Sequence, residues 1–446
     1  MDFIPKNIDE ERAMLKDIGI VSIKGLFADI PEEIQKKAQL NLPEPLSELQ
    51  LRKKITYIAR KNRAYKTSFL GAGCYSHYIP AIVSRIISKP EFCTAYTPYQ
   101  AEISQGILQA IFEYQTMICD LTGMDASNAS VYDGAEALAE AALISLKKTG
   151  RSDIIISKTV HPEYRQTVRT YLNAKNKNLV EIDIGSNGKT DIEKLKSAVN
   201  HNTAGILIQS PNFLGAVEDI MEVERAAHKN NSLLTVSVAD TSCLGILAPP
   251  GKLGADIVTA EGQSFGNPKS FGGSLLGIIA VKQGLIRHLP GRIVGQAVDR
   301  EGKKGYMLTL QAREQHIRRE KASCNICSNQ ALNALAATVY LTALGKNGII
   351  NLANLNLQKA HYAYESLKEF KVFSNSLLYN EFVIQFRNKD NMKRAGKELE
   401  KNSIEPGLDL EKFYPALKNC MLICVTEMNS KQDIDRFIEI VKKNSS

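Results

Sequence analysis

The sequence contains no long uninterrupted apolar segment. Charged residues interrupt residues 1–30 at Asp2, Lys6, Asp9, Glu10, Glu11, Arg12, Lys16 and Asp17. A secretory signal peptide needs an apolar core, and a membrane-spanning helix needs about 20 largely apolar residues. We therefore expect neither kind of segment, and we expect the protein to be cytoplasmic.

Cysteine is sparse and scattered. The eight cysteines are at positions 74, 93, 119, 243, 324, 327, 420 and 424. This spacing excludes the disulfide framework of a small secreted protein, and a 446-residue chain that is 44% hydrophobic and 23% charged can bury a sufficient core without such bonds. Cys324 and Cys327 form a lone CxxC pair, so we expect no zinc site and mostly buried cysteines.

The chain also lacks a basic stripe interleaved with aromatic residues. Its net charge is +8, but the lysines and arginines are spread along the sequence. This pattern does not favour nucleic acid, and an anionic protein surface or an anionic substrate is an equally good partner.

Short apolar runs alternate with helical patterns in the middle of the chain. The expected strands are residues 153–157, 179–184, 204–209, 233–238, 256–260 and 275–281. This alternation predicts an α/β fold whose mostly parallel sheet is flanked by helices. We expect a helical N-terminal arm over residues 1–66, a large α/β domain over 67–320 and a smaller C-terminal α+β domain over 321–446.

Three helix starts carry sequence signals. Thr97, Pro98 and Gln100 resemble a cap, a first helical residue and a capping box, so we expect a helix from there to Gly123. Thr190 and Glu193 repeat the capping-box pattern. The pattern of residues 323–344 predicts a long helix.

Several segments carry more polar and aromatic groups than folding requires. The richest is Thr94–Gly106, and others are Ser68–Gly73, His77–Pro80, Asn128–Ala135 and Arg313–Gln330. Together they closely resemble the signature segments of the P-protein of the glycine cleavage system. The resemblance extends over most of the chain, and its length is similar to one half of the long, single-chain form of that family.

The resemblance implies a pyridoxal 5′-phosphate (PLP)-dependent transferase fold type I and glycine decarboxylation as the reaction. The order of motifs looks like subunit 1 of the two-subunit form, which implies a heterodimer or heterotetramer with a subunit 2 that binds PLP through a lysine. It also implies the lipoyl group of H-protein as co-substrate and T-protein and L-protein as functional partners, without nucleic acid or membrane.

Two departures from the PLP-binding pattern are present. Asp240 follows an expected strand where a fold type I enzyme places its pyridine carboxylate, but Gln263 occupies the position of the PLP lysine. An amide cannot form an imine, so we expect no covalent PLP in this chain, although Lys269 is a candidate substitute. Glu136 would repel phosphate at a helix start where Asp133 is instead a good N-cap.

The resemblance places the working site near the interface of the two subunits. The candidate catalytic residues are Tyr96, Tyr99, Gln100, Glu102 and His77. The tyrosines are equally suited to interface packing and the polar groups to helix capping, whereas His77 is suited to proton exchange or to a purely hydrogen-bonding role.

Other polar residues have open roles. His161 begins a helix where a fold type I enzyme stacks a ring on its cofactor, and without PLP we expect it to be structural. Arg313, Arg318 and Arg319 either bind a carboxylate or the acidic surface of the lipoyl carrier, or form an exposed helix face paired with Glu314 and Glu320.

Two alternative functions remain at this point. The chain could be a self-sufficient PLP enzyme that uses Lys269, or a noncatalytic scaffolding or regulatory subunit. The first predicts a PLP absorbance band from this chain alone, and the second predicts that Tyr96, Tyr99 and Glu102 are dispensable for activity.

Overall fold

The computed structural model describes residues 7–38, 41–93, 97–322, 324–326, 328–373 and 376–444. The chain divides into two compact units, Met1–Ala64 and Tyr65–Ser446, which are described separately. Among the helices of these described ranges, none is both long and apolar enough to cross a membrane.

The N-terminal unit is helical, as the sequence predicts. It contains α1 (Ile8–Ile18), η1 (Ile23–Phe27), α2 (Glu32–Lys37) and α3 (Glu48–Ala59). Ser47 and Gln50 form a reciprocal capping box at the start of α3. Leu15 is the only buried residue among those described in this unit, so its helices hold little core of their own.

A seven-stranded sheet forms the centre of the second unit, in the order β2-β8-β7-β6-β5-β3-β4. The strands are β2 (Ala126–Ser127), β3 (Asp153–Ser157), β4 (Asn178–Ile182), β5 (Thr203–Gln209), β6 (Leu233–Val238), β7 (Ile257–Glu261) and β8 (Gly277–Val281). Strands β3 to β7 are parallel to one another. Strand β8 is antiparallel to β7, and β2 is antiparallel to β8. The predicted mostly parallel sheet is confirmed.

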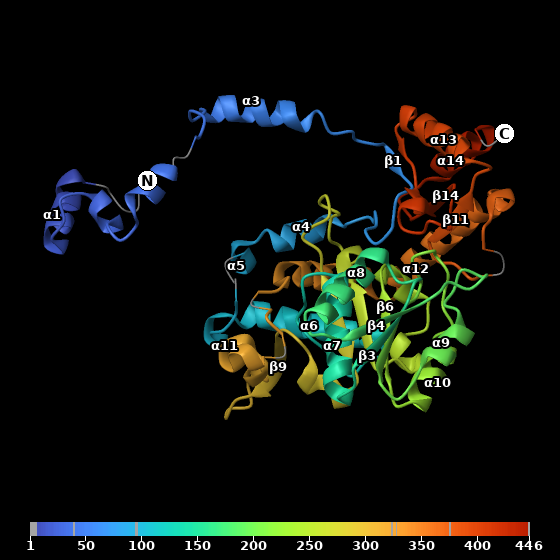
Figure 1. Cartoon of the computed structure of the whole chain (residues 1–446), viewed down its shortest axis with the longest axis horizontal. Helices are drawn as coiled ribbons and strands as arrows, with labels where there is room; N and C mark the ends of the chain where they lie inside the picture. The colour runs from blue at the N-terminus through green and yellow to red at the C-terminus, as the bar shows by residue number, and fades with distance from the viewer. Residues whose placement is uncertain are drawn as a thin grey trace. The chain divides into compact units, whose positions relative to one another are not determined.

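Helices cover both faces of this sheet (Figure 1). Ile154 and Ile156 pack in one hydrophobic cluster with α7 and α8, whereas Ile155 between them packs in the cluster on the other face, because successive strand side chains alternate. The helices of this region are α4 (Ala81–Ile87), α5 (Pro90–Cys93), α6 (Gln105–Thr122), α7 (Gly134–Thr149), α8 (Pro162–Asn173), α9 (Ile192–Ala198), α10 (Ile220–Lys229) and α12 (Ala331–Ser366).

The C-terminal layer, orange to red in Figure 1, combines a small sheet with two helices. Its elements are β11 (Glu381–Gln385), α13 (Lys389–Lys401), β12 (Ile404–Glu405), β13 (Leu408–Asp409), β14 (Cys420–Cys424) and α14 (Lys431–Lys443). Strand β1 (Thr67–Ser68) pairs with β12, and Phe69 stacks on Phe437 with ring centroids 4.1 Å apart. The segment that follows the N-terminal unit is therefore anchored in the C-terminal layer.

A hairpin and a short helix complete the second unit. Strands β9 (Ile293–Val298) and β10 (Lys304–Thr309) pair antiparallel, and β10 contacts α6. The chain then forms η7 (Gln311–Arg313), α11 (Gln315–Arg318) and η8 (Arg319–Lys321).

Three predicted helix starts are wrong. Thr97 to Gln100 are not helical, and after the short η2 (Ala101–Ile103) the helix α6 begins at Gln105, because Gln100 is extended and Ser104 breaks the turn. Asp191, not Thr190, caps α9. Helix α12 begins at Ala331 rather than at residue 323, and the backbone of Gly345 interrupts it with a positive φ.

Candidate functional site

Two carboxylates lie at the carboxyl edge of the parallel sheet, where open α/β folds bind ligands. Asp240 comes two residues after β6, and Glu261 is the last residue of the neighbouring strand β7. Both side chains are buried, with exposed fractions of 4% and 1%. This edge is the position at which a fold type I enzyme would hold its cofactor.

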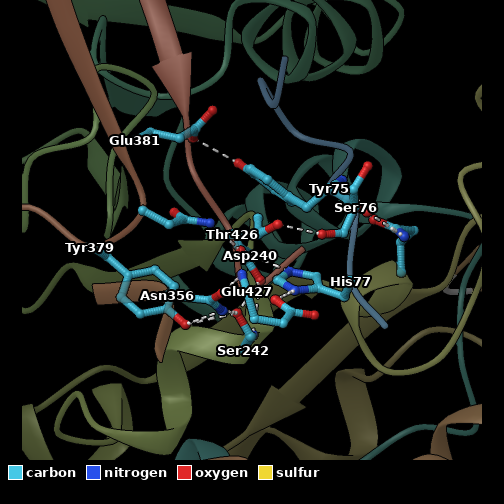
Figure 2. A network of polar contacts seen from close by, with 12 residues as sticks. Tyr75, Ser76, His77, Asp240, Ser242, Asn356, Tyr379, Glu381, Thr426 and Glu427 are labelled. Atoms are coloured by element: carbon cyan, nitrogen blue, oxygen red, sulfur yellow. Dashed lines mark hydrogen bonds and ion pairs between the residues drawn. The ribbon is translucent and has the colours of Figure 1, made fainter. Parts of the chain in front are cut away.

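The ring of His77 lies beside the carboxylate of Asp240 (Figure 2). Its Nε2 lies 3.2 Å from Asp240 Oδ2 and its Nδ1 lies 2.8 Å from Glu427 Oε2, so both ring nitrogens donate to carboxylates. Burial alone would lower the pKa of His77, but Asp240 and Glu427 outweigh it and raise the pKa to about 10. His77 is therefore an imidazolium at neutral pH.

The remaining acceptor sites of Asp240 are also occupied. Ser242 donates to Oδ1 through its hydroxyl at 2.7 Å and its backbone N–H at 3.0 Å, and Asn380 donates to Oδ2 at 2.5 Å. Figure 2 shows that the network continues from Ser242 to Tyr379 and from Tyr379 to Asn356. Burial opposes ionisation of Asp240, but His77 and these donors hold its pKa below the ordinary value.

Gln263 joins two separate segments of backbone. Its Oε1 accepts from the Tyr75 N–H at 2.9 Å, and its Nε2 donates to the carbonyls of Tyr75 at 3.0 Å and Asn267 at 2.7 Å. The side chain is 2% exposed. The amide at the expected lysine position thus holds the loop before His77 in place.

Glu261 occupies the N-terminal end of α7. Its carboxylate accepts from the backbone N–H groups of Gly134 at 3.0 Å, Gln263 at 2.9 Å and Leu276 at 2.9 Å. Burial raises its pKa to about 7 despite these donors. Backbone N–H groups at a helix start are suited to bind an anion, and here a carboxyl group of the protein accepts from one of them, the Gly134 N–H.

The start of α7 follows the predicted pattern. The Asp133 carboxylate accepts from the Glu136 N–H at 2.8 Å, and the Glu136 carboxylate accepts from the Tyr132 N–H at 2.8 Å. Burial raises the pKa of Glu136, and Asp133 adds to the shift. The prediction that Asp133 is an N-cap with an acidic third residue is confirmed.

Aromatic rings fill the space in front of α7. His161 stacks on Tyr164 with ring centroids 4.7 Å apart, and its Nε2 donates to the Ala72 carbonyl at 2.9 Å. A side-chain carbon on Gly134 would lie 2.6 Å from the Tyr164 hydroxyl, and one on Gly73 would lie 2.9 Å from the His161 ring. These contacts hold the His161 ring against Tyr164 and the Ala72 backbone, and its purely structural role stays a prediction.

These residues do not fit a PLP cofactor. The predicted lysine position holds a fully bonded amide, the predicted pyridine carboxylate Asp240 is bonded to His77, and Glu261 accepts from the Gly134 N–H at the helix start where a phosphate would bind. Lys269 forms no side-chain hydrogen bond or ion pair with any described residue, and nothing in these contacts prepares it as a substitute. Among the described residues no cluster of three or more potential metal ligands is present either.

The other predicted site residues form a separate group. Tyr99 is 49% exposed, its hydroxyl accepts from Arg292 at 3.1 Å, and its ring contacts His316 edge-on at a centroid distance of 5.6 Å. Gln100 and Glu102 have exposed side chains, and Tyr96 lies outside the described residues. The structure thus brings the Tyr99 segment beside the His316 segment, and it places His77 in the buried network instead.

The arginines of the His316 segment have backbone partners. Arg313 donates to the carbonyls of Leu289, Gly291 and Leu310, and Arg318 donates to that of Ala312. Neither forms an ion pair with Glu314 or Glu320 in the described part of the chain. Cys324 accepts from the Gly291 N–H at 3.4 Å, and Cys327 lies outside the described residues.

Sequence reasoning missed Glu261, Glu427 and Arg292. Glu427 comes shortly after the apolar strand β14, as Asp240 comes shortly after β6. A carboxylate shortly after an apolar strand was the sequence signal that could have identified Glu427. The His77–Glu427 contact spans 350 positions, so only the folded chain reveals the pair.

Known proteins resemble the chain over its whole length. A family model described as the glycine cleavage system P-protein matches residues 1–441. The probable glycine dehydrogenase (decarboxylating) subunit 1 of Desulfitobacterium hafniense is 49% identical and covers 98% of each chain. That of Brevibacillus brevis is 51% identical and covers 97% of this chain and 96% of its own.

Solved structures give the same result for the fold. The crystal structure of an inhibitor-bound glycine decarboxylase (P-protein) matches with a TM-score of 0.90, 39% identity and full coverage of both chains. A sphingosine-1-phosphate lyase of Burkholderia pseudomallei matches at 15% identity with a TM-score of 0.66 over 93% of this chain and 94% of its own, which shows the fold alone. The predicted PLP-dependent transferase fold type I is confirmed.

Proposed function

Because the chain belongs to the glycine cleavage system P-protein family, we propose that it is the subunit of a two-subunit glycine decarboxylase that carries no Schiff-base lysine. The assembled enzyme decarboxylates glycine with PLP held by subunit 2, releases CO2 and passes the aminomethyl group to the lipoyl group of H-protein, before T-protein and L-protein act. The observation that carries this proposal is the fully bonded Gln263 amide at the lysine position.

The N-terminal unit supports an obligate partner. On α3, Leu51, Ile55 and Ile58 are spaced on one helix face and are 48%, 55% and 49% exposed. Helices of this length are marginal alone, and an apolar face of this kind normally packs against another element. We assign this face to the contact with subunit 2, in a heterodimer or a heterotetramer.

The Tyr99 segment is the part of this chain that we assign to the shared site. Tyr99 is held by Arg292 and His316, and Gln100 and Glu102, whose side chains are exposed, follow it in the sequence. A phenol, an amide and a carboxylate at an interface can orient an amino-acid substrate on the partner subunit by hydrogen bonds. Tyr96 belongs to the same proposal.

His77 has a different role in this proposal. Its side chain is 2% exposed and both nitrogens are bonded to carboxylates, so it has no path to a substrate proton. We assign His77 to the scaffold that fixes the loop and the C-terminal layer to the sheet, rather than to proton exchange.

The test is glycine-dependent exchange of labelled bicarbonate in the presence of lipoyl H-protein. We expect activity when this chain is mixed with subunit 2 and none from this chain alone. Exchange and a PLP absorbance band from this chain alone, both abolished by Lys269→Ala, would instead establish a self-sufficient enzyme.

A second experiment separates a catalytic subunit from a scaffold. Tyr99→Phe and Glu102→Gln should each lower turnover at least about tenfold while the assembled mass, measured by light scattering, stays unchanged. Glu113→Gln, which makes the same charge change as Glu102→Gln on the exposed side of α6, is the matched control. Unchanged turnover in both site variants would support a noncatalytic scaffold.

A further inference from the structure

Positive charge that is spread along the sequence gathers around one cavity of the folded chain. This cavity of about 540 Å³ is lined by Lys147, Arg287, Arg313, Arg318 and Lys321 together with Leu310 and Ala312. No described residue in its lining carries a carboxylate. We call this cavity, with its five lysines and arginines, the basic cavity.

A second cavity of about 480 Å³ continues the basic cavity. The two share Lys147 and Lys321, and the second adds Lys175 and Lys177. Its lining includes two carboxyl groups, those of Glu140 and Glu320. Burial raises the pKa of Glu140 to about 8, with a further contribution from Glu136, so Glu140 is largely neutral near pH 7. The seven lysines and arginines named for the two cavities outnumber these carboxyl groups, and the combined surface stays positive.

Three of the cations that line the basic cavity have no ion-pair partner among the described residues. Arg287, Arg318 and Lys321 form no ion pair with any described residue, whereas Lys196 beside another cavity contacts Glu193 at 2.9 Å and Glu222 at 3.1 Å. Like charges that share a cavity repel one another, and an anionic ligand relieves that repulsion.

Arg313 fixes the geometry of the basic cavity. Its guanidinium donates to three backbone carbonyls, those of Leu289, Gly291 and Leu310, so it adds charge from a rigid position. Leu289 and Gly291 come directly before Arg292, the partner of Tyr99, in the sequence. The basic cavity is thus attached to the same loop as the Tyr99 segment.

The kind of anion follows from the donors. The cavity offers ammonium and guanidinium groups on side chains, and its described lining holds no aromatic residue on which a nucleic-acid base could stack. Several cations spread over two joined cavities match several carboxylates on one chain, which guanidinium groups bind in a planar, bidentate way.

We propose that the basic cavity, extended by Lys175 and Lys177, binds a carboxylate-rich segment of a protein partner. This is a binding property of the chain by itself, and it does not depend on the proposed catalytic function. The probe is a fluorescein-labelled decaglutamate peptide, and the measurement is its anisotropy on titration with the full chain.

We expect saturable binding that weakens as salt is added. Arg287→Glu/Lys321→Glu should weaken it at least about tenfold, because two attractive contacts become repulsive. The matched control is Arg225→Glu/Lys229→Glu, which makes the same charge change beside the cavity that contains Lys196. The control should bind the peptide within about twofold of the unchanged chain.

Folding of each variant is checked by its circular dichroism and melting temperature, and the milder pair Arg287→Gln/Lys321→Gln replaces the first variant if it is unfolded. Equal loss of binding in the control variant, or none in the cavity variant, would overturn the proposal. So would equally tight binding of a single-stranded DNA of the same charge, or displacement of the peptide by millimolar inorganic phosphate.

Discussion

His77 carries a positive charge inside the protein because two carboxylates contact it. Removing charge from water is costly, and the cost is recovered only when partners satisfy every donor. Asp240 and Glu427 do so from two different layers, one after β6 of the large sheet and the other after β14 of the C-terminal layer. The imidazolium therefore links the two layers electrostatically.

Replacing His77 should show how much its contacts with the two carboxylates contribute to stability. His77→Gln is expected to lower the free energy of unfolding by about 3–5 kcal/mol at neutral pH, because it leaves buried carboxylates short of a cation. The folded pKa of about 10 lies above the ordinary value of 6.5, so the stabilisation is complete below about pH 6.5 and is lost as the pH rises toward 10.

The measurement is urea unfolding of both proteins at about pH 6 and about pH 9. The difference between them should shrink at the higher pH. A difference that does not change with pH would show that His77 is neutral in the folded chain.

Introducing a lysine at position 263 should not create a cofactor site. Gln263→Lys breaks the three hydrogen bonds to Tyr75 and Asn267 and is expected to cost about 2–4 kcal/mol of stability. Glu261 still accepts from the Gly134 N–H at the start of α7. We expect no Schiff-base absorbance after incubation with PLP, with the unchanged chain as control, and a borohydride-trapped adduct on the new lysine would contradict the expectation.

Strands were easier to predict than helix ends. The limits of β3 and β6 match the sequence prediction, because buried parallel strands are continuous apolar runs that local composition reveals. The start of α6 could not be located in this way, because Thr97, Pro98 and Gln100 carry capping signals and yet are not helical. Site contacts such as His77–Glu427 and Gln263–Tyr75 depend on residues distant in sequence, which no local pattern contains.

The N-cap of α7 can be tested as an element. Asp133→Ala removes the acceptor of the Glu136 N–H and is expected to lower the free energy of unfolding by about 1 kcal/mol. Asp133→Ser, which keeps a capping oxygen, should recover most of this loss in chemical denaturation. Equal destabilisation by both substitutions would mean that the charge of Asp133, not its capping oxygen, stabilises the helix.

At the scale of the whole molecule, the core of the second unit is complete while the N-terminal unit leaves its apolar residues exposed. Leu51→Asp/Ile55→Asp on α3 should leave the stability of the isolated chain within about 0.5 kcal/mol of its original value. The same change should weaken association with subunit 2 at least about tenfold in analytical ultracentrifugation, because it places charges in an apolar contact.

Lys53→Asp/Lys54→Asp alters two exposed α3 residues without removing an apolar contact and is the control. Normal association of the Leu51→Asp/Ile55→Asp protein would show that this face of α3 is not at the interface. A comparable loss in the lysine variant would indicate that net charge, rather than apolar burial, governs assembly.

The contacts at the carboxyl edge of the sheet also limit which single substitutions the chain tolerates. Gln263 bonds to Tyr75, Glu261 bonds to Gly134, and His77 bonds to Asp240, so a change at any of these three positions breaks a contact with a distant segment. A lysine introduced at position 263 alone would therefore lower stability before it provided any chemistry. Sequence change at this edge is expected to require coordinated substitutions rather than single ones.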